Sequence, residues 1–262
     1  MAVVESYNIG VTPIRTWLVG ENIRPSMLQF ATGFFYKHTV QPMKREAYLI
    51  TNRHVAIDEE RSLYPNVFRI LIHNSIDILR SVREIEIPLY DEKLNPVWYE
   101  HPHINDADIV ALNIDGYITA GDVIEYWSKD DFPSQSQIIA FGSKVSIIGY
   151  PLAFYDDVHN FPIARAGTIA SPYGVAFQGE PCFLVDANLH EGMSGSPVII
   201  PRSGVRPECG TVIHTLLGIH SAGWGVYNRF EPNWIELGLG KVWYPDLIEE
   251  IVSDKKLGSV RI

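Results

Sequence analysis

The stretch 189-LHEGMSGSPV-198 places Ser194 between two nearby glycines, directly before a β-type apolar run. Glycines next to such a serine allow the backbone to approach a bound group closely, because they carry no side chain. A serine hydroxyl is a weak nucleophile unless a histidine takes its proton and a buried carboxylate orients that histidine. The stretch therefore directs attention to histidine and aspartate residues elsewhere in the chain.

Two upstream segments contain such partners. The segment 48-YLITNRHV-55 is a β-type run that ends at His54, and 106-DADIVAL-112 is an acidic pair that enters an apolar run. Asp108 directly precedes that run, whereas Asp106 is the alternative carboxylate two residues earlier. The chain therefore offers a histidine, an aspartate and a serine in that order, each beside a predicted strand.

These segments resemble those of the trypsin-like serine peptidases of the chymotrypsin fold. Three further segments are similar to family strands: 31-ATGFF-35, 142-GSKVSIIGYP-151 and 217-LGIHSAG-223. The resemblance implies that Ser194 is the nucleophile, His54 the general base and Asp108 the carboxylate that orients it. It also implies an oxyanion hole formed by the backbone N–H groups of Gly192 and Ser194.

The resemblance implies an all-β fold of two six-stranded antiparallel barrels with a C-terminal helix. Residues 1–127 would form the barrel with His54 and Asp108, and residues 128–262 the barrel with Ser194 and the specificity pocket. Many short β-rich runs between turn residues agree with such a fold. They lie near residues 12–18, 28–37, 47–51, 67–73, 83–88, 96–100, 109–114, 136–140, 144–150, 163–170, 182–186, 197–201, 211–222 and 239–243. Pro245, followed by acidic residues, predicts the start of the final helix.

The segment 218-GIHSAG-223 resembles the G-x-H-x-x-G motif of glutamyl endopeptidases and viral 3C-type proteases. The resemblance implies that His220 binds a Glu or Gln side chain before the scissile bond, with Ser221 and Gly223 also binding substrate. The alternative is a buried histidine bonded to its own barrel. No acid occurs in 187-ANLH-190, which disfavours an Arg/Lys pocket, although a shift in register to Asp186 would restore that option.

Met193 departs from the animal digestive members of the family, which have an aspartate there that pairs with a newly cut N-terminal amine. A methionine cannot form that ion pair. Activation by insertion of an N-terminus is therefore not expected, and the pattern is closer to bacterial and viral relatives.

The bulk composition limits the partners and the location of the protein. The net charge of −10 argues against nucleic acid as a partner. No window approaches the ~18 apolar residues of a membrane span, and residues 1–6 do not resemble a signal peptide. With only Cys182 and Cys209, which could form at most one bridge, a reducing cytoplasmic location is favoured. The expected partner is a peptide or protein substrate, no cofactor is expected, and the sequence specifies no oligomeric state.

Other functions remain open at this stage. Ser196 stands where the G-x-S-x-G motif of an α/β-hydrolase esterase has its last glycine, and the acid and histidine of that family follow the serine. A latent or inactive peptidase fold that only binds peptides is a second alternative. A metal cluster of His101, His103, Asp106 and Asp108 is a third, but no further ligand set with suitable spacing follows.

Overall fold

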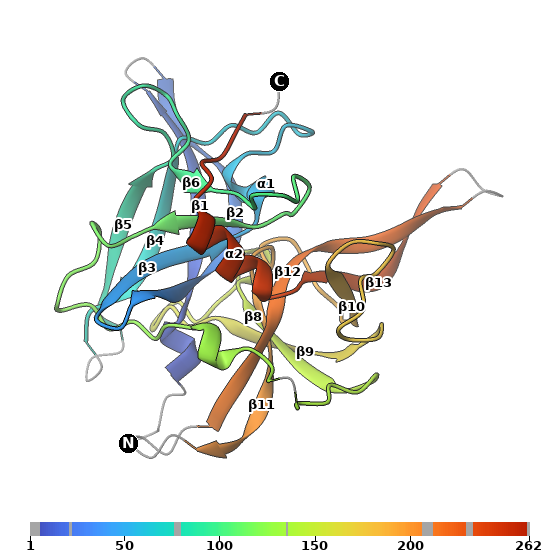
Figure 1. Cartoon of the computed structure of the whole chain (residues 1–262). Helices are drawn as coiled ribbons and strands as arrows, with labels where there is room; N and C mark the ends of the chain where they lie inside the picture. The colour runs from blue at the N-terminus through green and yellow to red at the C-terminus, as the bar shows by residue number, and fades with distance from the viewer. Residues whose placement is uncertain are drawn as a thin grey trace.

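The computed structural model describes residues 6–20, 23–75, 80–134, 136–205, 212–228 and 233–260. It consists of two antiparallel β units and a C-terminal helix, as predicted (Figure 1). The α/β-hydrolase alternative is wrong, because that fold alternates helices with parallel strands. Our expectations for the first five residues and for Cys209 lie outside the described residues.

The N-terminal unit is an antiparallel sheet in the order β5-β4-β1-β2-β3-β7-β6, with seven strands where six were predicted. Its two end strands are linked by the segment between them, where the Val97 N–H donates to the Leu89 carbonyl at 3.0 Å. The strands are β1 (Val11–Gly20), β2 (Ile23–Gln41), β3 (Lys44–Thr51), β4 (Val67–His73), β5 (Val82–Pro88), β6 (Trp98–Tyr99) and β7 (Val110–Asn113).

The C-terminal unit is a closed six-stranded barrel in the order β10-β13-β12-β11-β8-β9. Its strands are β8 (Lys144–Gly149), β9 (Ile163–Ile169), β10 (Cys182–Asp186), β11 (Pro197–Val205), β12 (Val212–Asn228) and β13 (Asn233–Trp243). Strands β12 and β13 are longer than predicted and form an arm that projects from the barrel (Figure 1). The strand predicted near 136–140 is wrong: this segment is irregular, and Ile138 in it is 92% exposed.

Strand β3 shows why the two units pack together. Tyr48 and Ile50 belong to a core that also contains Ile148 and Trp243 of the C-terminal barrel, whereas Leu49 belongs to the core of the N-terminal sheet. Successive side chains of a strand point to opposite faces, so β3 is buried on both faces. Its apolar residues therefore alternate between two cores, and the end of β3 is held firmly in place.

Helix α2 (Asp246–Asp254) covers the seam between the units. Leu247, Ile248, Ile251 and Val252 are buried, which is the spacing of one apolar helix face. The remaining helical pieces are single turns: α1 (Arg53–Ala56), η1 (Ser6–Ile9), η2 (Lys129–Asp131) and η3 (Pro151–Ala153). Among the described residues, no helix combines the length and the hydropathy needed to cross a bilayer.

Candidate active site

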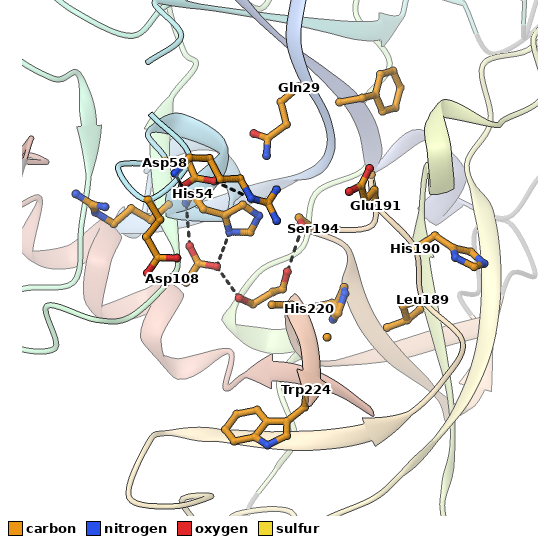
Figure 2. Close-up of a pocket in the computed structure, with 18 of the residues that line it drawn as sticks. Gln29, His54, Asp58, Asp108, Leu189, His190, Glu191, Ser194, His220 and Trp224 are labelled. Atoms are coloured by element: carbon orange, nitrogen blue, oxygen red, sulfur yellow. Dashed lines mark hydrogen bonds and ion pairs between the residues drawn. The ribbon is translucent and has the colours of Figure 1, made fainter. Parts of the chain in front are cut away.

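A cleft of about 1050 Å³ is lined by residues of both units (Figure 2). All residues predicted to take part in catalysis or to form the pocket reach it. The lining residues from the N-terminal unit include Phe30, His54, Asp58, Asp106 and Asp108. Those from the C-terminal unit include Leu152, Gly192, Ser194, His220, Ser221, Gly223 and Trp224.

The pairing of β3 with β7 brings His54 and Asp108 together. In this antiparallel pair Thr51 lies opposite Val110, so the residues just after β3 and just before β7 share one end of the sheet. His54 Nδ1 lies 2.7 Å from Asp108 Oδ2, and the backbone N–H of His54 donates to Asp108 Oδ1 at 2.9 Å. Asp108, not the exposed Asp106, is thus the carboxylate that contacts His54.

Asp108 also accepts a hydrogen bond from the Ser221 hydroxyl at 2.5 Å. The sequence had suggested substrate binding for Ser221, and its contact with Asp108 had not been predicted. Burial alone would raise the pKa of Asp108, but the charge and hydrogen bond of His54 and the bond from Ser221 outweigh burial and lower it. Burial lowers the pKa of His54, but the charge and hydrogen bond of Asp108 raise it by more, so the net pKa of His54 is raised.

Ser194 lies on the turn between β10 and β11. Its carbonyl accepts a hydrogen bond from the Thr32 N–H at 2.9 Å, and the next N–H, that of Gly195, donates to the His220 carbonyl at 2.9 Å. Its hydroxyl donates to the Ser221 carbonyl at 3.1 Å (Figure 2). Within the described part of the chain no hydrogen bond joins the Ser194 hydroxyl to His54.

Two glycines allow this turn to approach its neighbours. Gly192 has φ +89° and a side chain there would meet the Tyr150 carbonyl at 2.3 Å, while Gly195 has φ +86° and would meet the Thr32 carbonyl at 2.0 Å. The Glu191 carbonyl accepts a bond from the Leu152 N–H at 2.7 Å. Because a trans peptide directs its C=O and N–H to opposite sides, the N–H of Gly192 points away from Leu152.

The turn that contains Ser194 is attached to the N-terminal sheet through Thr32, within the segment 31-ATGFF-35. The buried Thr32 hydroxyl donates to the Gly192 carbonyl at 2.7 Å and accepts from the Tyr150 N–H at 3.1 Å. Together with the backbone bond to Ser194, these contacts fix the position of the turn relative to strand β2. The sequence suggested a family strand here but gave no sign of this role.

We expect Thr32→Val to reduce the free energy of unfolding by about 2–4 kcal/mol, because it leaves a buried carbonyl and a buried N–H without their partner. Thr32→Ser keeps the hydroxyl and serves as the matched control, with a smaller loss from the deleted methyl group. Urea denaturation of the three proteins measures the difference. Equal stability of the valine and wild-type proteins would show that the hydroxyl is not needed to hold the turn.

A model of the trypsin-like peptidase domain matches residues 31–205 of the chain. The chain belongs to the trypsin-like peptidase domain family. Among solved structures it is similar to the inactive form of a serine-to-alanine mutant of Rv3671c from M. tuberculosis H37Rv, with a TM-score of 0.47 and 14% identity over 94% of this chain and 86% of that chain. A search of curated proteins finds no match.

In this trypsin-like peptidase domain Met193 is fully buried in the apolar core of the C-terminal barrel. The Ser196 hydroxyl lies 4.0 Å from its sulfur. An apolar side chain thus occupies the place where the digestive members have a charged one. The turn that contains Ser194 is therefore anchored by the packing of Met193 in the core of the C-terminal barrel.

His220 lies in the wall of the cleft and is 3% exposed. Its Nδ1 lies 3.3 Å from the Lys241 carbonyl. Burial lowers the pKa of His220 to about 4, so the imidazole is neutral near pH 7. Because a carbonyl oxygen can only accept, this contact requires the proton of the neutral ring on Nδ1 and leaves Nε2 as an acceptor.

The four residues considered as a metal cluster do not form one set of ligands. His101 Nε2 lies 2.8 Å from Glu250 on helix α2, and its Nδ1 accepts from the Ile104 N–H at 2.9 Å. His103 is exposed, and Asp108 binds His54 and Ser221. In the described ranges no group of three or more His, Cys, Asp or Glu side chains could hold a metal ion.

Proposed function

We propose that this trypsin-like peptidase domain is a serine endopeptidase that cleaves peptide bonds through Ser194, His54 and Asp108. The observation that carries the proposal is the bond from His54 Nδ1 to Asp108 at 2.7 Å, in the cleft that also exposes the Ser194 side chain. The Asp108 carboxylate keeps the proton on Nδ1, so the lone pair of Nε2 is available to a serine hydroxyl. That arrangement is what an activated serine nucleophile requires.

The reaction would proceed in two halves. Ser194 turns from the Ser221 carbonyl toward His54, loses its proton to Nε2 and attacks the peptide carbonyl carbon. The C–N bond breaks when His54 returns the proton to the leaving amine, which leaves an acyl ester on Ser194. Water, deprotonated by His54, then attacks the ester, and the proton returns to Ser194 as the carboxylic acid product leaves.

The N–H groups of Gly192 and Ser194 are the proposed oxyanion hole. Both residues line the cleft, and the Leu152 bond to the Glu191 carbonyl turns the Gly192 N–H away from Leu152. Donors fixed before the reaction stabilise the developing negative charge, each by roughly 3–4 kcal/mol. Gly192 has a positive φ in this orientation, and glycine adopts a positive φ without strain because it has no side chain.

A peptide-binding domain that is latent as an enzyme is the second candidate. The observation that favours it is the hydroxyl of Ser194, which donates to the Ser221 carbonyl at 3.1 Å and not to His54. Cleavage of a proteome-derived peptide library by the wild-type protein separates the two candidates. Cleavage that Ser194→Ala removes supports the peptidase, whereas peptide binding without cleavage supports the latent domain.

We expect a preference for Gln over Glu before the scissile bond at pH 7. With the ring proton on Nδ1, His220 Nε2 can accept from a Gln amide but cannot donate to a Glu carboxylate. Glu191 and Glu236 line the same cleft, and their negative charges would repel the carboxylate of a substrate Glu side chain. Missing one such hydrogen bond should disfavour Glu by about 1–3 kcal/mol, which is about 5- to 150-fold in kcat/KM.

Matched peptides that differ only in Gln or Glu at this position measure the ratio between pH 5 and 8. His220→Ala should lower the Gln/Glu ratio to the smaller preference that repulsion by Glu191 and Glu236 leaves, while cleavage of an activated ester continues. A profile dominated by Arg, Lys or large apolar residues, or a preference for Glu at pH 7, would show that His220 does not select the substrate in this way.

A further inference from the structure

Arg53, the residue before His54, holds the opposite side of helix α1. Helix α1 contains only four residues, Arg53–Ala56, and so short a helix has no stability of its own. Its position must come from contacts with the rest of the protein. On the cleft side these are the two hydrogen bonds from His54 to Asp108. Away from the cleft, Val55 and Ala56 pack in the core of the N-terminal sheet, and the side chain of Arg53 supplies the hydrogen bonds.

The buried guanidinium of Arg53 makes four hydrogen bonds. Two go to Glu59, at 2.7 and 2.9 Å, one goes to Glu100 at 3.0 Å, and one goes to the Ser259 carbonyl at 2.9 Å. Arginine suits this place because its planar group donates in several fixed directions at once. Arg53 thus connects helix α1 to a segment that lies 206 residues away in sequence.

We call residues 256–259, which follow helix α2, the C-terminal strap. The Lys256 carbonyl accepts from the Glu100 N–H at 2.9 Å, and the Gly258 N–H donates to the Trp98 carbonyl at 2.8 Å, so the strap runs beside β6. At its end the Ser259 N–H donates to Glu100 Oε1 at 3.3 Å. Glu100 Oε1 also accepts from the indole of Trp98 at 3.0 Å.

Gly258 lies against the indole ring of Trp98, which is fully buried. A side chain at Gly258 would come within 2.1 Å of Trp98 Nε1. Because Trp98 has no room to move, any such side chain must lift the strap. The strap can therefore be displaced by a substitution that changes no atom of Arg53, Glu100 or His54.

We propose that the C-terminal strap is a positioning element of the active site, which acts through Glu100 and Arg53 to fix helix α1 and the imidazole of His54. The proposal rests on the proposed peptidase function. In addition to the packing of Val55 and Ala56, helix α1 is held by hydrogen bonds to Asp108 on one side and from Arg53 on the other, and the strap completes the second set. Loss of the strap lets α1 shift, which lengthens the bond from His54 to Asp108 and moves Nε2 away from Ser194.

The test uses Gly258→Ala and Arg53→Ala in the full chain, with Arg53→Lys as a conservative variant. Gly116→Ala is the matched control, because a side chain at Gly116 meets nothing within 4 Å. Titration with a fluorophosphonate gives the fraction of active sites, so turnover is expressed per active site. This correction removes any loss that comes only from unfolded protein.

We expect kcat per active site to fall about tenfold or more in Gly258→Ala and Arg53→Ala, with KM changed little, because small displacements of a catalytic group are costly. Arg53→Lys should lie between these variants and the wild type. The pKa of His54 should fall as its bond to Asp108 loosens. Asp58, which raises the His54 pKa, and Arg61, which lowers it, are both retained in these variants.

The pKa of His54 is read in two ways, from the acidic limb of kcat/KM and from NMR titration of the His54 ring protons. The NMR measurement does not depend on turnover, so it tests the strap even if the wild-type protein cleaves no peptide, a result that would overturn only the proposed function. An unchanged His54 pKa in folded Gly258→Ala and Arg53→Ala would overturn the proposal, whether or not the wild-type protein cleaves peptides.

Discussion

Ser194→Ala should lower peptide cleavage by several orders of magnitude, about 10⁴- to 10⁶-fold, because it removes the only atom that forms the acyl ester in the proposed reaction. Peptide affinity should stay close to that of the wild type, since the cleft keeps its walls and the Gly192 N–H. Cleavage of one good peptide, measured with equal amounts of the two proteins, gives the ratio.

Ser196→Ala is the matched control for this experiment. Ser196 lies two residues further along the same turn, but its buried hydroxyl is directed to the sulfur of Met193. It should keep most of its turnover once the fraction of folded protein is taken into account. If Ser194→Ala cleaved at the wild-type rate, another group would be the nucleophile, and the proposed reaction would be wrong.

Asp108→Asn should lower kcat by about 10⁴-fold near neutral pH, as expected when the orienting carboxylate of a triad is replaced by an amide. Asp108 accepts from the His54 ring, the His54 N–H and the Ser221 hydroxyl. An amide has one oxygen and also presents a donor, so it cannot serve all three. The tautomer with its proton on Nε2 is then favoured, and that nitrogen can no longer take the proton of Ser194.

Asp106→Asn is the matched control, because it makes the same change two residues away at an exposed position. It should alter kcat by much less.

In the wild type, cleavage should fall as the pH drops through the raised pKa of His54, because a protonated imidazole cannot accept another proton. A larger loss in the Asp106 variant than in the Asp108 variant would contradict the assignment of the carboxylate.

The residues that we propose to carry the chemistry are those that the sequence predicted. His54 and Asp108 each stand at the end of an apolar strand run, and Ser194 lies in a glycine-containing turn before another. Antiparallel pairing of β3 with β7 then brings His54 and Asp108 within 2.7 Å. Residue type, local strand pattern and the resemblance to the trypsin-like serine peptidases were enough to predict that these residues lie together.

The contacts that hold those residues in place could not be predicted in the same way. Thr32, Ser221 and Arg53 make hydrogen bonds to groups that are 160, 113 and 206 residues away in sequence. No local pattern marks such partners, because each depends on the final packing of both units. The local pattern also failed around Ile138. An apolar run there suggested a strand, but the segment is irregular and the Ile138 side chain is 92% exposed.

The central claim is that Ser194 is a nucleophile activated by His54. The most direct test is labelling of the folded protein with a fluorophosphonate, followed by mass spectrometry of its peptides to locate the adduct. We expect one rapid adduct on Ser194, none at that site in Ser194→Ala, and a strongly reduced rate in His54→Ala. Absence of an adduct from the wild-type protein, or equally rapid labelling of other serines, would contradict the claim.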